Sequence, residues 1–551
     1  MAPPQPQTDA TAIAKQPMNE LSIDMRHGFA AIACIVAANV AFCAGCSPGS
    51  SKNHESAAQA TGFLNDLAKV ESSASRLQLD EGIEQRIHAF CGDCHAVPDP
   101  GLFERHVWYQ EVKKGYEFYA QSGRLDLDPP PLEQVVRYYR QKSEPIMRFN
   151  DLGEIDQGWL DRFRIDKIDW KDGNYIIPGV SSIQWLDLMA PGKFDLVVCD
   201  MRDGSVNLVD LKSSPATRRV LARIGNPART TLVDVDDDGL RDLLVADLGS
   251  VNPFDHTFGQ VVWLRRVPDS QSFERRTVIG GRGRIADVFL GDFGDESSKE
   301  LVIAEFGHRE AGGIHRLQGD WQSMGADQRN LYTIDPRPGT IRVVPHDWDG
   351  DDRLDFAALV SQQFESVELF LNRNSNFARR VIWRADNLGF GSTDIEPVDL
   401  DGDGDMDIVY TNGDSFDNNF ANCSHGVHWL ENRGNLQFDC HRLIDLPGAY
   451  RTRAGDFDSD GDLDLVCVAN LPQNVEPQSL KDSNPVSVLV LEQRSDKQFA
   501  PRVMARGSPR YPALEVADFD GNGKLDFAVG TLLFELVGSK ALPRLAIWWQ
   551  R

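Results

Sequence analysis

The feature that most constrains this chain is a short Asp-rich motif that recurs along most of its length. Clear copies of nine residues begin at Asp234, Asp347, Asp399, Asp456 and Asp518, and degenerate copies begin at Asp187 and Asp292. Successive copies start 47 to 62 residues apart. A repeat of this length predicts one supersecondary unit per copy, because a single unit buries too little apolar surface and must pack on its neighbours.

The residues around each motif have the pattern of four strands. Apolar runs such as ALEVA precede the motif, and runs such as DIVYT follow it. A third run such as VSVLVL and a fourth that begins with Phe, such as FARRVIW, complete the unit. Runs of this kind, bounded by Gly, Asn and Asp, are typical of strands. Seven four-stranded units predict a mainly β fold, a seven-bladed β-propeller over residues 160–551.

The last unit is short by one strand. The sequence ends with LAIWWQR, which contains the third run of this unit, and no fourth run follows it. The segment RFRIDKIDW at residues 162–170 precedes the first unit and has the pattern of a strand. We expect this segment to pair with the last unit and to close the ring of blades.

The motifs have the composition of calcium loops. Oxygen-bearing side chains occupy positions 1, 3, 5 and 9, and Gly usually occupies position 6. Calcium is a hard cation that takes about six to eight oxygen ligands, and a backbone carbonyl near position 7 would add one. The predicted metal ligands are Asp234, Asp236, Asp238, Asp242, Asp347, Asp349, Asp351, Asp355, Asp399, Asp401, Asp403, Asp407, Asp456, Asp458, Asp460, Asp464, Asp518, Asp520, Asn522 and Asp526.

Some copies depart from this pattern. Asp352 replaces Gly at position 6 of the copy that begins at Asp347, which makes that site less secure. The copies at Asp187 and Asp292 have lost ligands, and we expect them to bind no ion. The alternative for all copies is an acidic turn that holds no metal.

The five clear motifs, with their strand pattern, resemble the FG-GAP or VCBS repeats of integrin-like propellers. The resemblance extends over about residues 160–551. It implies blades that are stabilised by calcium. It does not by itself imply a function, because one fold serves many functions.

A second motif precedes the repeats. Residues 80–95 read DEGIEQRIHAFCGDCH, in which three apolar residues recur at helical spacing before the sequence C-G-D-C-H. In a C-x-x-C-H motif, two thiols reach the vinyl groups of haem c and the adjacent imidazole ligates the iron. We therefore predict haem binding by Cys91, Cys94 and His95, with His95 as the proximal metal ligand. A redox C-x-x-C or a zinc half-site is the alternative.

The segment at residues 76–148 resembles a single-haem cytochrome c domain, which is all-α. Further helices are expected near Phe103–Gln121 and Pro131–Lys142. Such cytochromes usually take a sixth iron ligand from a Met in the loop before the last helix, and this chain has none there. The sixth ligand therefore stays open between His106, Met147 and no protein ligand.

The N-terminal residues have the order of a secretory signal. Residues 1–45 contain a polar leader, a basic start, an apolar run at residues 29–42 and small residues before Cys46. The run is short for a membrane span. The Ala-Gly-Cys ending resembles a bacterial lipoprotein signal, which implies lipidation of Cys46, followed by a flexible tether over residues 46–75. An ordinary signal cleaved nearby is the alternative. We expect an extracytoplasmic protein, periplasmic or at the cell surface, that is anchored to a membrane by lipid.

Four cysteines lie in the repeat region. Cys199 and Cys467 occur in the apolar runs LVVCD and LVCVA and are expected to be buried small side chains. Cys423 and Cys440 are candidates for a disulfide in an exported protein.

Two features suggest a binding face on the propeller. The loops opposite the Asp motifs are long and polar, as at residues 412–426, and ligands often bind where such loops gather on a rigid scaffold. Arg229, Arg342 and Arg451 each precede their motif by five residues, at the start of the innermost strand. These residues could ring the axis and attract an anion. The alternative is that they form salt bridges between neighbouring blades.

The formal net charge of −26 argues against a nucleic-acid-binding protein, because phosphate contacts need a basic surface. The five clear motifs contain 23 of the acidic residues, so most of the excess belongs to the predicted coordination shells. We predict an exported c-type cytochrome with a calcium-binding propeller that transfers electrons. It would act with a redox partner protein, or within an oxidoreductase for a sugar or other small molecule. The alternative is a surface adhesion or recognition propeller with an accessory haem domain.

Overall fold

The computed structural model describes residues 79, 82–93, 97–170, 177–294, 299–308, 311–318, 330–374, 376–387, 389–494, 497–507, 509–534 and 542–551. The predicted leader and signal, Cys46, the tether, Cys94 and His95 lie outside the described residues. Within the described part of the chain, no helix combines the length and the apolar character that a membrane crossing requires.

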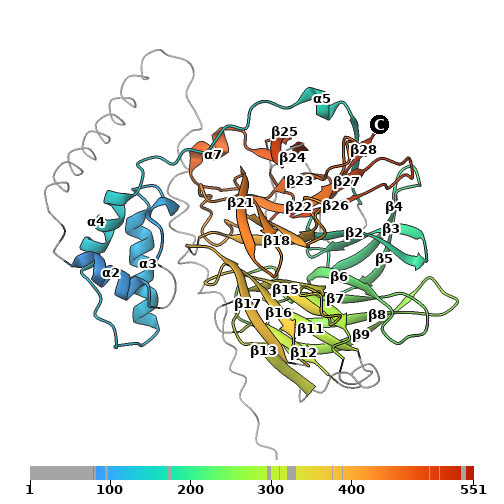
Figure 1. The fold of residues 1–551 in the computed structure, drawn as a ribbon, viewed down its shortest axis with the longest axis horizontal. Coiled ribbons are helices and arrows are strands. Elements are labelled where there is room, and N and C mark those ends of the chain that lie inside the picture. Colours follow the sequence, from blue (N-terminus) through green and yellow to red (C-terminus); the bar gives the residue numbers. More distant parts are fainter. Residues whose placement is uncertain are drawn as a thin grey trace, which may run out of the picture. The chain divides into compact units, whose positions relative to one another are not determined.

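Three helices form a small unit before the strands (Figure 1). They are α2 (Ile83–Cys91), α3 (Trp108–Gln121) and α4 (Leu132–Lys142), with a 3-10 turn at Pro100–Leu102. The apolar residues that recur at helical spacing in α2 are all buried. They pack with residues of α3 and α4, where Trp108 stacks on Tyr139 with ring centroids 4.1 Å apart. The helices predicted near Phe103–Gln121 and Pro131–Lys142 are therefore present, with the first beginning five residues later than predicted.

The rest of the chain forms seven four-stranded antiparallel sheets, the predicted seven-bladed β-propeller. Two short helices, α5 (Gln157–Leu160) and α7 (Gln478–Asp482), lie in its connections. The first three blades are β2 (Val180–Ala190), β3 (Lys193–Asp200), β4 (Ser205–Asp210) and β5 (Thr217–Arg223); β6 (Pro227–Val233), β7 (Asp242–Asp247), β8 (Gly259–Arg266) and β9 (Phe273–Arg282); and β10 (Ile285–Gly291), β11 (Glu300–Glu305), β12 (Gly313–Leu317) and β13 (Leu331–Asp335).

The next three blades follow in chain order. They are β14 (Thr340–His346), β15 (Asp355–Val360), β16 (Ser366–Asn372) and β17 (Phe377–Arg384); β18 (Ser392–Val398), β19 (Asp407–Asn412), β20 (Gly426–Asn432) and β21 (Phe438–Asp445); and β22 (Ala449–Gly455), β23 (Asp464–Ala469), β24 (Val486–Arg494) and β25 (Gln498–Arg506). The seventh blade contains β26 (Ala513–Ala517), β27 (Asp526–Gly530), β28 (Leu545–Gln550) and β1 (Phe163–Ile168).

Blades pack through apolar residues of their middle strands. The second strands β7, β15 and β23 are buried at every position, which explains their nearly continuous apolar sequences. Phe356 stacks on Phe370 of its own blade at 4.8 Å and meets Phe289 of the preceding blade at 5.8 Å. Phe377, which begins the fourth strand of that blade, packs on Phe293 of the preceding blade at 5.2 Å. The recurrent Phe of the sequence pattern is therefore a contact between blades.

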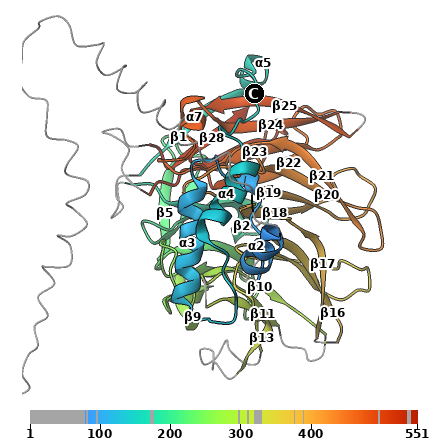
Figure 2. The same cartoon turned by 90° about the vertical axis from the view of Figure 1, so that its left-hand side faces the viewer.

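The ring closes by pairing segments from far apart in the sequence (Figure 2). Strand β1 pairs antiparallel with β28, in a register that sets Phe163 opposite Gln550 and Ile168 opposite Leu545. The seventh blade thus takes its fourth strand from residues before the first blade, as predicted from RFRIDKIDW. This closure covers the edge that β28 would otherwise expose.

A buried ion pair reinforces the closure. The guanidinium of Arg544, which is 2% exposed, places Nε 3.0 Å from Asp200 Oδ2 and Nη1 2.8 Å from Asp169 Oδ1. Nη1 of Arg544 also donates to the carbonyl of Trp170 at 3.2 Å. The residues that follow β1, end β3 and precede β28 are thus joined at one side chain.

Candidate metal centres

The five clear motifs form the same tight turn between the first and second strands of a blade. Residues at positions 4 and 6 are left-handed in every copy, with φ between +55° and +99°. The carboxylate at position 1 accepts the N–H of position 6 at 2.8–3.2 Å in every copy. Gly suits these positions because it adopts positive φ without steric cost.

Carboxylate oxygens converge in each turn. Three carboxyl groups bring one oxygen each to within 4.8 Å of one another in five groups: Asp234, Asp236 and Asp242; Asp347, Asp349 and Asp351; Asp399, Asp401 and Asp407; Asp456, Asp458 and Asp460; and Asp518, Asp520 and Asp526. The predicted ligands Asp238, Asp355, Asp403, Asp464 and Asn522 lie in the same turns but outside these groups of three.

Several of these oxygens are buried without a hydrogen-bond donor. They are Oδ1 of Asp234, Asp236, Asp349 and Asp458, and Oδ1 of Asp462, which lies in the same turn as Asp458 but outside its group of three, also lacks a donor. A buried carboxylate oxygen without a donor is unfavourable, because it has lost its water and gained no partner. An all-oxygen set of this kind fits a hard cation such as calcium. The residues present therefore fit the ion that the sequence pattern favours.

The Asp at position 9 has a structural role that the sequence analysis missed. Its side chain is fully buried in every clear copy. One oxygen accepts the N–H of position 2 at 3.0–3.2 Å. The other accepts an N–H at the end of the third strand, at 2.6–2.9 Å. This carboxylate therefore fixes the turn to its blade, and any metal contact would be additional.

Burial penalises these carboxylates when no cation is near. It raises the pKa of Asp464 to about 7 and the pKa of Asp526 to about 6, against the hydrogen bonds that lower them. A nearby divalent cation would offset this cost by favouring the charged form.

The five turns differ in their basic neighbours. In three of the turns a carboxylate forms an ion pair with a basic side chain at or just after the end of a third strand. These pairs are Arg265 with Asp236, Arg373 with Asp349 and Lys497 with Asp401. The carboxylates of the turns at Asp456 and Asp518 pair with no Lys or Arg in the described part of the chain. The motif at Asp456 contains five acidic residues and the motif at Asp518 three, so the negative charge of the turn at Asp456 is the least compensated by the protein itself.

The two degenerate copies hold cationic side chains near their remaining acids. Asp187 keeps the turn, since Gly192 donates to it at 3.3 Å, and Arg241 lies 3.3 Å from the same carboxylate. In the copy at Asp292, position 9 is Glu300, which accepts from Arg316 Nη2 at 2.8 Å.

Asp352 provides a test of the turn geometry. Its φ of +63° is left-handed, and its N–H bonds to Asp347 at 2.8 Å, a contact that Gly would retain. We expect Asp352→Gly to raise the free energy of unfolding by about 0.5–1 kcal/mol, measured by urea denaturation, because a Cβ is unfavourable at this φ. Asp352→Ala is the matched control and should gain nothing. Equal stability of the two variants would contradict the view that the positive φ at this position favours Gly.

The haem motif begins at the end of α2. Cys91 is the last residue of this helix and packs against the core of the helical unit, where burial raises the pKa of its thiol. Cys94 and His95 lie outside the described residues, so the haem ligands stay a prediction. Of the two candidates for the sixth ligand, Met147 is 6% exposed, whereas the His106 side chain is 74% exposed.

The axial arginines do not form a free anion-attracting ring. Nη1 of Arg342 lies 2.8 Å from Asp287 Oδ2, and Nε of Arg451 lies 3.1 Å from Asp394 Oδ2. Arg229 approaches the same two carboxylates at 3.9 and 3.7 Å. The alternative of salt bridges between blades is confirmed. Sequence reasoning missed both Asp residues, although each lies five residues before its own motif, as the arginines do.

The long loop between β19 and β20 contains a carboxyl group with a raised pKa. Burial and the charge of Asp417 raise the pKa of Asp414 to about 6, while Arg284 lowers it. A carboxyl group that titrates near neutral pH can act as a general base. Cys423 of this loop and Cys440 of β21 are both free thiols, so the disulfide considered from the sequence does not form here.

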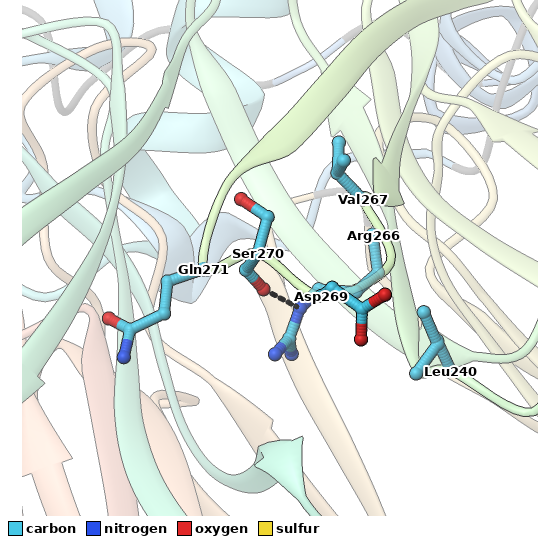
Figure 3. Close-up of a pocket in the computed structure, with 6 residues that line it drawn as sticks. All are labelled: Leu240, Arg266, Val267, Asp269, Ser270 and Gln271. Carbon is cyan, nitrogen blue, oxygen red and sulfur yellow. Dashed lines mark hydrogen bonds between the residues drawn. The ribbon is translucent and has the colours of Figure 1, made fainter.

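Two shallow pockets lie on the surface of the propeller. One, of about 250 Å³, is lined by Leu240, Arg266, Val267, Asp269, Ser270 and Gln271 (Figure 3). Its Arg266 donates to the carbonyls of Ser270 and Leu188, so the protein itself uses this guanidinium. The other, of about 520 Å³, includes Trp429, His441 and Lys497. Its Glu431 is paired with both of the last two residues.

Comparison with known proteins supports the repeat assignment. A family model described as FG-GAP-like repeat matches residues 347–410. No curated protein sequence matches the chain. A similar solved structure is titled "Crystal structure of BBS1N in complex with ARL6DN, soaked with lead", with 12% identity over 70% of this chain and 97% of that chain and a TM-score of 0.40.

Proposed function

We propose that this protein is an exported c-type cytochrome in which a calcium-binding FG-GAP-like propeller supports a haem segment for electron transfer. The observation that carries the proposal is the C-G-D-C-H sequence at the end of α2, where the Cys91 thiol packs against an aromatic core. The two thiols and the imidazole would hold haem c, which would carry one electron at a time when bound. The signal-like N-terminus and Cys46 support export and a lipid anchor.

The calcium part rests on the turns. Positions 1, 3 and 5, with position 9 where its oxygen converges, would hold one ion in each clear copy. The buried oxygens that lack a donor support this assignment, because a cation would satisfy them. An ion bound in each turn would join the first strand of a blade to its second and third strands through position 9. Calcium would therefore stabilise individual blades.

Contacts of the helical unit support a role for the loop after β19 in the redox reaction. Phe103 of the helical unit meets Phe420 of this loop with ring centroids 5.3 Å apart. Cys423 of the same loop donates to the carbonyl of Arg148 at 3.4 Å. We propose that a sugar or other small hydroxylic substrate binds at this loop and that electrons leave to a redox partner protein.

Replacement of His95 tests the haem assignment. We expect His95→Ala to abolish the native Soret and visible bands, because the proximal imidazole is lost. His88→Ala is the matched control, since His88 lies on α2, three residues before Cys91, and its Nε2 forms a hydrogen bond with the Tyr138 hydroxyl at 3.1 Å. This control should keep the native spectrum. Identical spectra for wild type and His95→Ala would contradict the assignment.

Anaerobic mixing with candidate substrates distinguishes the enzyme from an adhesion propeller. Reduced haem bands that appear only with a sugar or alcohol would support an oxidoreductase. Haem that is reduced only by a protein donor would support a relay. A protein without haem that binds a cell surface would support the adhesion alternative.

A further inference from the structure

Lys497 belongs to one blade and contacts the metal turn of the neighbouring blade. It lies directly before β25 of the sixth blade, and its N–H donates to the carbonyl of Arg494, the last residue of β24, at 3.0 Å. Its Nζ lies 2.5 Å from Oδ2 of Asp401, which is position 3 of the turn in the fifth blade. Arg265 and Arg373, by contrast, belong to the same blades as the turns that they contact. The Lys497 side chain therefore joins two blades at a predicted metal ligand.

The ammonium group occupies a carboxylate that calcium would also use. The Asp401 side chain is 2% exposed, and both of its oxygens have donors, because Oδ1 accepts the N–H of Asp403 at 3.2 Å and Oδ2 accepts from Lys497. Asp401 is one of the three carboxylates that converge in this turn. An ion held by these carboxylates would lie beside the ammonium group, and two cations at one carboxylate repel each other. Calcium and the ammonium group therefore compete for Asp401.

A second acceptor lies within reach of the same ammonium group. Oε1 of Glu431, on β20 of the fifth blade, lies 3.4 Å from Nζ of Lys497, and the ring centroid of Trp429 lies 5.7 Å from it. The Lys497 side chain is 51% exposed, so packing does not hold it in one position. Glu431 is buried and also pairs with Arg433 at 2.6 Å and with His441 at 2.7 Å. Glu431 can therefore accept the displaced ammonium group without losing its other partners.

We propose that Lys497 competes with calcium for the turn at Asp399 and moves from Asp401 to Glu431 when the ion binds. The inference rests on the calcium binding proposed above. Without the ion, the ammonium group compensates the charge of the turn and ties the sixth blade to the fifth. With the ion, this contact between blades is exchanged for metal ligation within the fifth blade. The apparent calcium affinity of this turn is lowered accordingly, because the ion binds only the fraction of molecules in which Asp401 is released.

Calcium titration of the full chain by isothermal calorimetry tests the competition. Lys497→Met removes the ammonium group and should raise the calcium affinity of one site about fivefold, which corresponds to about 1 kcal/mol, the upper range for a partly exposed ion pair. Lys497→Arg is the matched control, because it keeps the positive charge and should gain no affinity. Both variants keep a Cβ at this left-handed residue, whose φ is +60°, so the backbone preference does not change.

A double-mutant cycle assigns the change in affinity to this turn. In an Asp401→Asn background, Lys497→Met should leave the calcium affinities unchanged, because the ion pair is already lost. Melting temperatures give a second readout of the same competition. Lys497→Met should lower the melting temperature more in chelator than in saturating calcium, because the ammonium group compensates the carboxylates only when the ion is absent.

A crystal structure of the calcium-loaded chain provides a measurement that does not depend on the variants. It should show an ion in the turn at Asp399 and Nζ of Lys497 within hydrogen-bond distance of Glu431 but not of Asp401. An ion in this turn with Lys497 still bonded to Asp401 would overturn the proposal. Equal calcium affinities of the wild type and Lys497→Met would also overturn it, while leaving the calcium sites themselves in place. Absence of calcium binding at every turn would overturn the proposed calcium function, and this inference with it.

Discussion

Removal of calcium is expected to lower the melting temperature of the propeller by at least about 10 °C. An ion that binds only the folded state stabilises it by about 2.7 kcal/mol at one hundred times its dissociation constant, and five turns are available. Without the ion, the unpartnered oxygens and the mutual repulsion of the converging carboxylates remain. Differential scanning calorimetry with calcium and with a chelator measures the difference.

A pair of matched variants assigns the effect to particular turns. Asp458→Asn changes a turn whose carboxylates pair with no described Lys or Arg, whereas Asp236→Asn changes one in which Arg265 already pairs with the carboxylate. We expect the first to remove about 2 kcal/mol of calcium-dependent stability and the second less than about 1 kcal/mol. A melt that a chelator leaves unchanged would contradict the metal assignment.

Arg544→Met is expected to lower the free energy of unfolding by about 3–5 kcal/mol, because it leaves the Asp200 carboxylate charged and buried. The effect should be large because Arg544 joins the residues around the closing strand β1 to the first and seventh blades. Urea denaturation of the calcium-loaded protein measures it.

A second substitution identifies the cause of that loss. Asp200→Asn in the Arg544→Met background removes the uncompensated charge and keeps an oxygen for the N–H groups of Arg202 and Asp203. About half of the lost stability should return. Recovery of none of it, or an initial loss below about 1 kcal/mol, would show that the ion pair does not stabilise the closure.

The propeller was predictable because its signals are periodic. The Asp motifs mark each blade, and the Phe of the fourth strand recurs because it packs on a neighbouring blade, as Phe377 does on Phe293. The closing strand was predictable because the last unit lacked a fourth strand and RFRIDKIDW, which has a strand pattern, belonged to no other unit.

Other features depend on contacts that no single motif reveals. Asp464 matches a calcium ligand in sequence, yet both of its oxygens accept backbone N–H groups, and one of these lies in β24. Asp287 and Asp394, which pair with the axial arginines, could not be predicted because each pair joins residues of different blades that lie far apart in the sequence. Cys423 and Cys440 could not be assigned, since pairing depends on distances that spacing does not set.

The central claim is that this propeller belongs to a c-type cytochrome. The most direct measurement is the pyridine haemochrome spectrum of the full chain, produced in cells that attach haem c and then washed with acidified solvent that removes non-covalent haem. The account predicts a c-type spectrum with one haem per chain, lost in a Cys91→Ala, Cys94→Ala double variant. A wild-type protein without covalent haem under these conditions would contradict it.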